Sequence, residues 1–404
     1  MLLKLAWRNI WRNKRRSIIV ITSVAVGVVA TMVYDTLSRG MVFQMLNNQI
    51  GAHVSHIQIH RKGFKDNPEA QSYIPDDQAV EKVVRETPGV AHFSERVLTY
   101  GLVSSAANSS GVSIIGVDPA QEQFITMIKK NMVAGEYLSG RPNEVVLGKS
   151  LAEKLDVGLG ERVVAMASAI DGHVGSDVFK VVGTFQTPSS EFDKSSIYII
   201  RPNAQQMLGL GTHVSEFALI LNDVNQLDQI REIISRKLGD TYEVLTYPEI
   251  LPLLVLMINI TEQSMVIFYV IVGIALIFGI INTMLMSVFE RVHEFGVLKA
   301  IGMKDGKMLS MVLFEAFFLG MVGTVIGFGI GYVIYVSLSG SGLNLAVFSE
   351  GLRSFGVGAI IYPVLTWDVI ADALLVIPFV AVVGAIYPGM RAVRLHPIDA
   401  IRYV

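Results

Sequence analysis

The chain has 404 residues and a formal net charge of −2; 51% of the residues are hydrophobic and only 17% are charged. So few charges argue against a purely soluble protein, in which charged residues make up about a quarter of the chain. The net charge excludes a basic surface for nucleic acid, and the absence of cysteine excludes disulfides, thiol catalysis and Cys-based metal sites.

The N-terminal segment at 1–16 carries six basic residues and no acidic one, and an apolar run from Ile18 to Tyr34 follows it. This order also fits a cleaved signal peptide. The run, however, approaches the roughly 20 residues that a bilayer span needs, and no A-x-A cleavage site closes it. The sequence therefore favours an uncleaved signal anchor, with a cytoplasmic basic helix at 1–16 and a first transmembrane helix at 17–39.

Residues 40–262 have the composition of a soluble domain. Apolar residues at helical spacing predict helices at 76–86, 150–155 and 224–238, and short apolar or alternating runs predict strands at 56–60, 112–117, 144–147, 179–185, 197–200 and 217–221. Short strands interspersed with helices predict an α+β domain, and the less regular region at about 134–202 is expected to form an inserted lobe.

Three further apolar runs, at 263–289, 308–338 and 367–390, are long enough to cross a bilayer. Basic residues concentrate at 1–16, in the 290–307 loop and in the 391–404 tail, whereas the 339–366 loop contains only Arg353. The positive-inside rule therefore places both termini and the 290–307 loop in the cytoplasm. We expect a multi-pass membrane protein with four transmembrane α-helices and a large α+β extracytoplasmic domain between helices 1 and 2.

Two features of the third span at 308–338 predict contacts. Glu315 should have a polar partner, because an unpaired carboxylate within the membrane is costly. Gly323, Gly327 and Gly331 form a small-xxx-small ladder that allows helix backbones to approach closely. The ladder could pack against another helix of the same chain or against a second membrane subunit, and the sequence leaves both alternatives open.

No pattern of an enzyme or a metal centre stands out. The string closest to a phosphate-binding loop, at 135–142, has Arg141 where the loop needs Lys, so no nucleotide cofactor is expected in this chain. His53, His56 and His60 lie close together, but without a third ligand at metal-binding spacing a solvated strand face is favoured over a zinc site. A membrane enzyme acting on lipids would need a nucleophile and a base, and no such pair is recognisable.

The 290–302 segment is a charged, helix-prone stretch between two membrane-length runs. It must lie at the membrane surface, since each charge would cost about 2.5–3.5 kcal/mol at the bilayer centre. It could simply return the chain to the membrane, or it could dock into a cytoplasmic protein.

The sequence Ser-Val-Phe-Glu-Arg-Val-His-Glu-Phe-Gly-Val-Leu-Lys-Ala-Ile-Gly at 287–302 resembles the loop after the second span of FtsX-like/MacB-like ABC transporter permeases. Segments 5–17 and 387–402 resemble the two termini of that family. Within the outer domain the resemblance at 179–193 is closest to lipoprotein-releasing permeases of the LolC/LolE type. The 168–176 stretch is shorter than the chaperone-recruiting hook of the LolC type, and the loop motif is nearer to the MacB type.

The resemblance implies a non-catalytic permease subunit of a type VII ABC transporter. Two permease chains, identical or not, would pair with an ATPase subunit dimer that binds ATP and Mg, while the outer domain works by mechanotransmission. The implied ATPase-coupling residues are Glu290, Arg291, Glu294, Gly296, Lys299 and Gly302, and the implied tail residues near the ATPase are His396, Pro397 and Asp399.

The function implied is the extraction or export of a lipoprotein or lipid-like amphiphile from the bacterial inner membrane. Membrane lipid and a periplasmic carrier or cargo lipoprotein would be further partners. The alternatives are MacB-like efflux of peptides or small amphiphiles and FtsX-like regulation of an extracytoplasmic hydrolase. Regulation ranks below transport, because the outer domain is larger than that of the division-type proteins.

Overall fold

The structure of the protein is a computed structural model, and it describes residues 2–394. It divides into two compact units. The helical unit consists of the described residues up to Val42, of Met257–Asn344 and of those from Ile360 onward. The sheet unit consists of Phe43–Leu256 and Leu345–Ala359.

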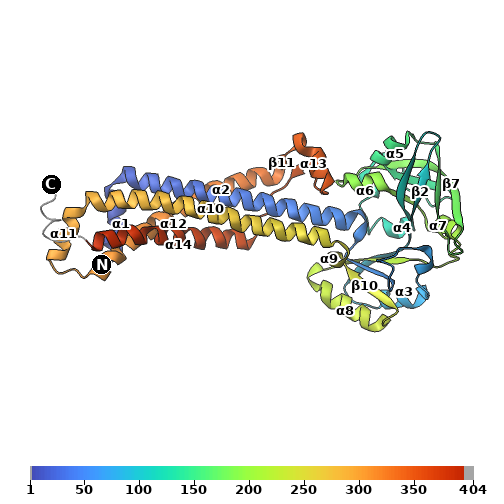
Figure 1. Ribbon diagram of the computed structural model, residues 1–404, viewed down its shortest axis with the longest axis horizontal. Helices are drawn as coiled ribbons and strands as arrows, with labels where there is room; N and C mark the ends of the chain where they lie inside the picture. The colour runs from blue at the N-terminus through green and yellow to red at the C-terminus, as the bar shows by residue number, and fades with distance from the viewer. Residues whose placement is uncertain (1, 395–404) are drawn as a thin grey trace. The chain divides into compact units, whose positions relative to one another are not determined.

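In the part of the chain that the structure describes, four helices are long and apolar enough to cross a membrane: α2 (Lys14–Gln49), α10 (Pro252–Glu290), α12 (Asp305–Ser341) and α14 (Trp367–Val393). They run alongside one another in Figure 1. Each predicted span lies inside one of these helices. All four helices extend three or more residues beyond the predicted span at one or both ends.

The helical unit is apolar inside and outside. Its core contains residues from every long helix, including Val24, Leu276, Ala316 and Ala381. The outward face of α10 is apolar as well, with Ile267 and Ile271 each 60% exposed. A helix that is hydrophobic all round belongs in a large core or a membrane, so the composition of both faces fits a membrane.

Two short helices and a two-stranded ribbon complete the helical unit. Helix α1 (Leu2–Arg12) precedes α2, α11 (Val292–Ala300) joins α10 to α12, and β11 (Leu343–Asn344) pairs antiparallel with β12 (Ile360–Ile361).

The sheet unit contains a ten-stranded sheet in the order β10-β1-β9-β2-β3-β8-β5-β7-β4, with β6 pairing β2 and β7 off this path. The strands are β1 (Ile57–Arg61), β2 (Val90–Ser104), β3 (Ser109–Val117), β4 (Met132–Gly135), β5 (Glu144–Gly148), β6 (Arg162–Ser168), β7 (Val174–Phe185), β8 (Ser196–Ile200), β9 (Glu216–Leu221) and β10 (Tyr242–Thr246). The helices are α3 (Asp77–Arg85), α4 (Pro119–Glu122), α5 (Lys149–Leu155), α6 (Ser190–Ser195), α7 (Arg201–Leu208), α8 (Leu227–Leu238), α9 (Tyr247–Ile250) and α13 (Ser349–Ser354).

Local sequence explains the helices that were predicted. The side chain of Asp76 caps α3 by accepting a hydrogen bond from the backbone of Ala79, and Val80 and Val84, one turn apart, are buried. The predicted strands are also present, with ends that differ by a few residues. The predicted fold class, four membrane helices with an α+β domain between the first and second, is confirmed.

The predicted inserted lobe at 134–202 stays a prediction, but strands within it pair with strands that precede it in the chain. Strand β8, which lies within it, pairs in parallel with β3, and β6 pairs with β2. One core also runs through both parts and includes Ile59 and Leu147. The sequence did not reveal this continuity, because β2 is 15 residues long, lacks regular alternation and pairs with different strands along its length.

Candidate functional site

The helix break between α10 and α11 lies at Arg291, whose backbone angles (φ −111°, ψ 14°) are not those of a helix. Helix α11 then buries Val292 and Phe295 against the core of the helical unit, where Phe295 is only 2% exposed. The opposite side is exposed: Val297 of α11 is 38% exposed, and Ile301, which directly follows α11, is 79% exposed. The polar His293, one turn before Val297, is exposed as well. One face of the 290–302 segment is thus buried against the helical unit, and the other face is exposed.

Arg291 connects α11 to α12 through a buried ion pair. Its Nη1 lies 3.0 Å from both carboxylate oxygens of Glu315, and its Nε lies 3.0 Å from Oε2 of Glu294. Asn9 of α1 donates a third hydrogen bond to Glu315, at 2.6 Å. The polar partner predicted for Glu315 is therefore confirmed, since its side chain is only 7% exposed and has two donors.

The N-terminal segment contacts the same helix break. Arg12 pairs with Glu294 at 2.5 Å, and Arg16 pairs with Glu290. We call these contacts, together with the Arg291–Glu315–Asn9 group, the polar clamp. The clamp joins α1 and the first turn of α2 to α10, α11 and α12.

The electrostatics of the clamp favour the charged form of Glu294. Partial burial acts to raise the pKa of Glu294, but hydrogen bonds from Arg12 and Arg291 outweigh it and hold that pKa below its ordinary value. The resemblance pointed to Glu290, Arg291 and Glu294 as residues that contact an ATPase. The structure places all three in contacts within the chain.

Lys299 is engaged at the far end of α11. It pairs with Asp305 at 3.1 Å and donates a hydrogen bond to the backbone carbonyl of Val393. Gly296 is buried on the same face as Phe295. Gly302 is exposed and has φ +93°, a left-handed conformation that favours glycine and that ends the segment in a turn.

The sequence reasoning missed the partners supplied by the N-terminal segment: Asn9, Arg12 and Arg16. A signal was present, because Arg12 and Arg16 are four residues apart, as are Glu290 and Glu294. Complementary charges at matched spacing on two helices could have suggested the pairing. His396, Pro397 and Asp399, predicted to lie near the ATPase, are outside the described residues, and that role stays a prediction.

The glycine ladder of α12 packs against α2 of the same chain. A Cβ added at Gly323 would lie 2.7 Å from the Cβ of Val24, and one at Gly327 would lie 2.7 Å from the carbonyl oxygen of Ala25. A Cβ at Gly331 would lie 2.6 Å from the sulfur of Met32. Of the two alternatives left open by the sequence, the structure therefore supports packing within the four-helix set.

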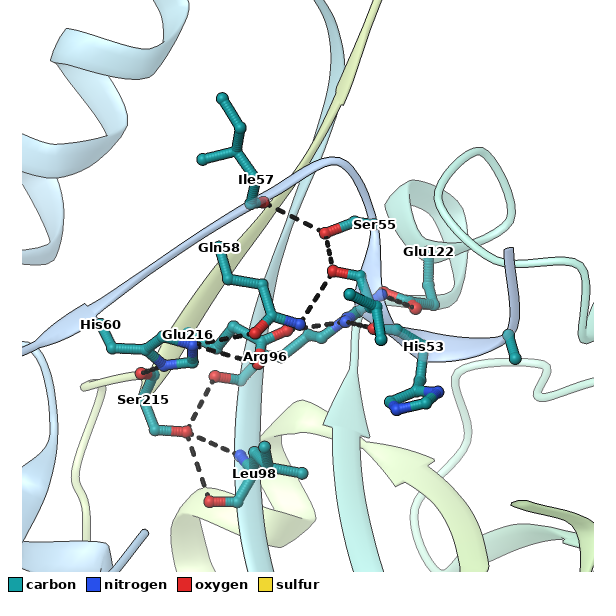
Figure 2. A network of polar contacts seen from close by, with 12 residues as sticks. His53, Ser55, Ile57, Gln58, His60, Arg96, Leu98, Glu122, Ser215 and Glu216 are labelled. Atoms are coloured by element: carbon teal, nitrogen blue, oxygen red, sulfur yellow. Dashed lines mark hydrogen bonds and ion pairs between the residues drawn. The ribbon is translucent and has the colours of Figure 1, made fainter. Parts of the chain in front are cut away.

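The histidines of β1 and of the turn before it do not form a solvated face. His60 is 3% exposed, because β1 lies between β10 and β9; its Nδ1 is 3.1 Å from the carbonyl oxygen of Ser215 and its Nε2 is 3.1 Å from Oε1 of Gln58 (Figure 2). The expectation of a solvated strand face is thus wrong. Within residues 2–394, no group of three or more His, Asp or Glu side chains is placed to hold a metal ion.

Two family models match this chain. Residues 17–237 match the MacB-like periplasmic core domain, and residues 266–397 match the FtsX-like permease C-terminal domain. The two matches cover the same order of elements as the structure, a domain inserted after the first long helix and three long helices following it.

Several relatives align along nearly the whole chain. It is 23% identical to the uncharacterized ABC transporter permease YknZ of Bacillus subtilis, over 99% of this chain and 98% of that protein. It is 22% identical to the lipoprotein-releasing system transmembrane protein LolC of Neisseria meningitidis, over 95% of this chain and 93% of that protein. The chain is 23% identical to the macrolide export ATP-binding/permease protein MacB of Escherichia coli. That alignment covers 99% of this chain but only 60% of the MacB protein.

The first family model alone covers more than half of the chain, and the second covers most of the rest. The chain therefore belongs to the MacB-like and FtsX-like ABC transporter permeases of the type VII family.

Proposed function

We propose that this permease extracts or exports a lipoprotein or another lipid-like amphiphile from the bacterial inner membrane, using ATP that a separate ATPase subunit dimer hydrolyses. The name of LolC supplies the cargo class, and the sequence has no phosphate-binding loop of its own. A second permease chain, a copy or a paralogue, completes the transporter. Both termini and α11 lie in the cytoplasm, and the sheet unit lies outside.

This proposal rests on one observation: one face of α11 is buried in the helical unit and the other face is exposed. The exposed apolar residues Val297, in α11, and Ile301, directly after it, form the docking face for the ATPase. Its buried face and the polar clamp connect it to the long helices, so a push on the exposed face must move α1, α2 and α12 together.

A movement of the membrane helices reaches the sheet unit through the two chain connections. Helix α2 leads through a π-helical turn into β1, and β10 leads through α9 into α10. Strands β1 and β10 pair with each other, with Ile57 opposite Thr246, and the backbone N–H of Tyr247 donates to the carbonyl oxygen of His56 at 3.1 Å. The two connections to the membrane helices are thus hydrogen-bonded neighbours, and a relative shift of α2 and α10 acts directly on one edge of the sheet.

The test uses the permease reconstituted with its ATPase in proteoliposomes that contain a labelled acylated lipoprotein. An Ile301→Glu or Val297→Glu variant should lose ATPase binding in a pull-down and ATP-dependent release of the lipoprotein, without a change in thermal unfolding. Val224→Glu is the matched control, because Val224 is 42% exposed in the sheet unit. Full release by Ile301→Glu would refute the proposed docking face.

Glu294→Lys and Gly302→Trp also interfere with this segment, and each should reduce ATP-coupled release. Glu294 bridges two arginines, however, so its replacement disturbs the clamp as well as the surface. The cargo is tested separately: if the unmodified transporter releases peptides or small amphiphiles but no lipoprotein, efflux of the MacB kind is the correct reading. A hydrolase that copurifies with the sheet unit and is activated by ATP would point to regulation.

A further inference from the structure

Helix α1 has a buried side and, next to it, an exposed apolar stripe. Ala6 and Ile10 are buried, and Ile10 belongs to the core of the helical unit. Leu3, Trp7 and Trp11 follow one another at intervals of four residues and are 52%, 43% and 49% exposed. Residues four apart share a face of a helix, so these large apolar side chains form one continuous surface. We call it the tryptophan stripe.

Basic residues flank the tryptophan stripe. The first 34 residues of the chain contain six lysines and arginines and no acidic residue. Two of the six, Arg12 and Arg16, belong to the polar clamp. The other four are exposed, and none of them forms an ion pair with a residue that the structure describes: Lys4, Arg8, Lys14 and Arg15. Lys4 and Arg8 follow Leu3 and Trp7 directly, so these two cations form a row beside the stripe.

Two polar contacts of α2 mark the edges of the hydrocarbon region. Arg16 pairs with Glu290 at one end, and at the other end the hydroxyl of Tyr269 donates to Asp35 at 2.7 Å. The α2 residues between Arg16 and Asp35 carry no charge. At 1.5 Å per residue the two levels are about 29 Å apart, which matches the roughly 30 Å thickness of a hydrocarbon core.

Helix α1 lies at the first of these edges, at the same end of the bundle as α11 (Figure 1). Its Asn9 donates to Glu315 of α12. Its Trp7 packs edge-on against Phe318, with 5.5 Å between the ring centroids, and Phe318 lies three residues further along the same membrane helix. The tryptophan stripe is therefore continuous with the surface of a membrane span, at the level where hydrocarbon gives way to lipid head groups.

This combination of side chains is typical of a helix that lies in the interface of an anionic membrane. Tryptophan rings favour the level of the head groups, and an amphipathic helix buries its apolar face among the lipids. Clusters of four or more lysines and arginines at the end of a span attract anionic phospholipid. The charge and the position of α1 thus both match a lipid surface.

We propose that α1 and the first turn of α2 bind anionic phospholipid in the leaflet that adjoins the polar clamp. Lys4 and Arg8 donate hydrogen bonds to the lipid phosphates, and Lys14 and Arg15 add to the attraction. The tryptophan stripe packs among the acyl chains beneath these phosphates. This binding goes beyond the proposed transport and requires neither the cargo nor the ATPase.

The bound lipid also contacts the helix that holds α11 in place. The same α1 supplies Asn9 to Glu315 and Arg12 to Glu294, so the lipid and the polar clamp act on opposite sides of one short helix. Anionic lipid should therefore favour the position of α1 in which the clamp is closed.

The test uses tryptophan fluorescence of the full-length permease in phosphatidylcholine nanodiscs, without ATPase and at neutral pH. The chain has three tryptophans, so Trp367→Phe leaves Trp7 and Trp11 as the fluorophores. Bromine atoms on lipid acyl chains quench tryptophans that they approach. The nanodiscs contain the same low mole fraction of either brominated phosphatidylglycerol or brominated phosphatidylcholine.

Brominated phosphatidylglycerol should quench at least about threefold more than brominated phosphatidylcholine, because its charge concentrates it around α1. High salt should reduce the difference, since these cations are exposed. Equal quenching by the two lipids would overturn the proposal. So would tryptophans that neither lipid quenches and that only added ATPase protects from acrylamide, because the stripe would then be a protein-docking face.

Two double variants locate the site. Lys4→Gln with Arg8→Gln should abolish the preference for phosphatidylglycerol without a change in thermal unfolding, because neither side chain has an ion-pair partner among the described residues. Lys304→Gln with Lys307→Gln is the matched control. It removes the same charge from the start of α12, where Lys307 lies about 12 Å before Glu315 along the helix. A preference that survives the α1 variant, or that both double variants lose equally, would refute the site.

Discussion

The polar clamp contains a buried and an exposed ion pair within a few residues of each other, and they should differ in strength. Arg291 and Glu315 have side chains that are 12% and 7% exposed, whereas Arg12 and Glu294 are 54% and 42% exposed. The perturbation is a pair of double-mutant cycles: Arg291→Met with Glu315→Leu, and Arg12→Met with Glu294→Leu.

The magnitudes follow from burial. Removing one partner of a buried ion pair typically costs about 3–5 kcal/mol, because the other charge is left unpaired, whereas replacing both by apolar groups is often close to neutral. Arg291→Met or Glu315→Leu alone should therefore destabilise the helical unit by about 3 kcal/mol or more, and the double variant by much less than the sum. The exposed Arg12–Glu294 pair should couple by only about 0.2–1 kcal/mol.

The assay is equilibrium unfolding of the purified permease in mixed micelles, with the free energy of unfolding measured for each variant. Raising the salt concentration should weaken the Arg12–Glu294 coupling and leave the Arg291–Glu315 coupling nearly unchanged, since buried charges are poorly screened. If the two cycles return equal coupling energies, or if Glu315→Leu alone is neutral, the buried pair does not hold α11 to α12 as described.

Three other predictions concern separate parts of the chain. Gly327→Val should destabilise the helical unit by about 1–3 kcal/mol through overpacking against α2, whereas Gly329→Val, whose Cβ meets nothing within 4 Å, should be tolerated; thermal unfolding compares them. Arg353→Ala should leave the buried carboxylate of Asp193, now 3.0 Å from Arg353, without its ion-pair partner, and hydrogen exchange at 345–359 should become faster; unchanged exchange would contradict this contact. Burial lowers the pKa of His53 from 6.5 to about 4, so below pH 6.5 the unfolded chain binds a proton that the folded chain does not. The free energy of unfolding of the sheet unit should therefore be about 2 kcal/mol lower at pH 5 than at pH 7, and His53→Gln should reduce this loss.

The long membrane helices could be predicted because their signal is local. A run of some 20 apolar residues is enough to identify a span, and the distribution of Lys and Arg between the loops is enough to predict an orientation. The α3 helix was similarly accessible, since its cap at Asp76 and its buried face at Val80 and Val84 lie within nine residues. The loop motif at 287–302 carried the family resemblance for the same reason.

Contacts between distant segments were decided only by the tertiary structure. The sequence identified Glu290, Arg291 and Glu294 as a functional segment, but their partners Arg12 and Arg16 lie more than 270 positions away in the chain. The buried ion-pair group of Arg96, Glu122 and Glu216 was equally invisible, because its three members come from three different elements. Sequence by itself determined which segments are apolar and where the chain turns. The packing of those segments determined which charges are buried together, because burial and pairing depend on neighbours that chain order does not specify.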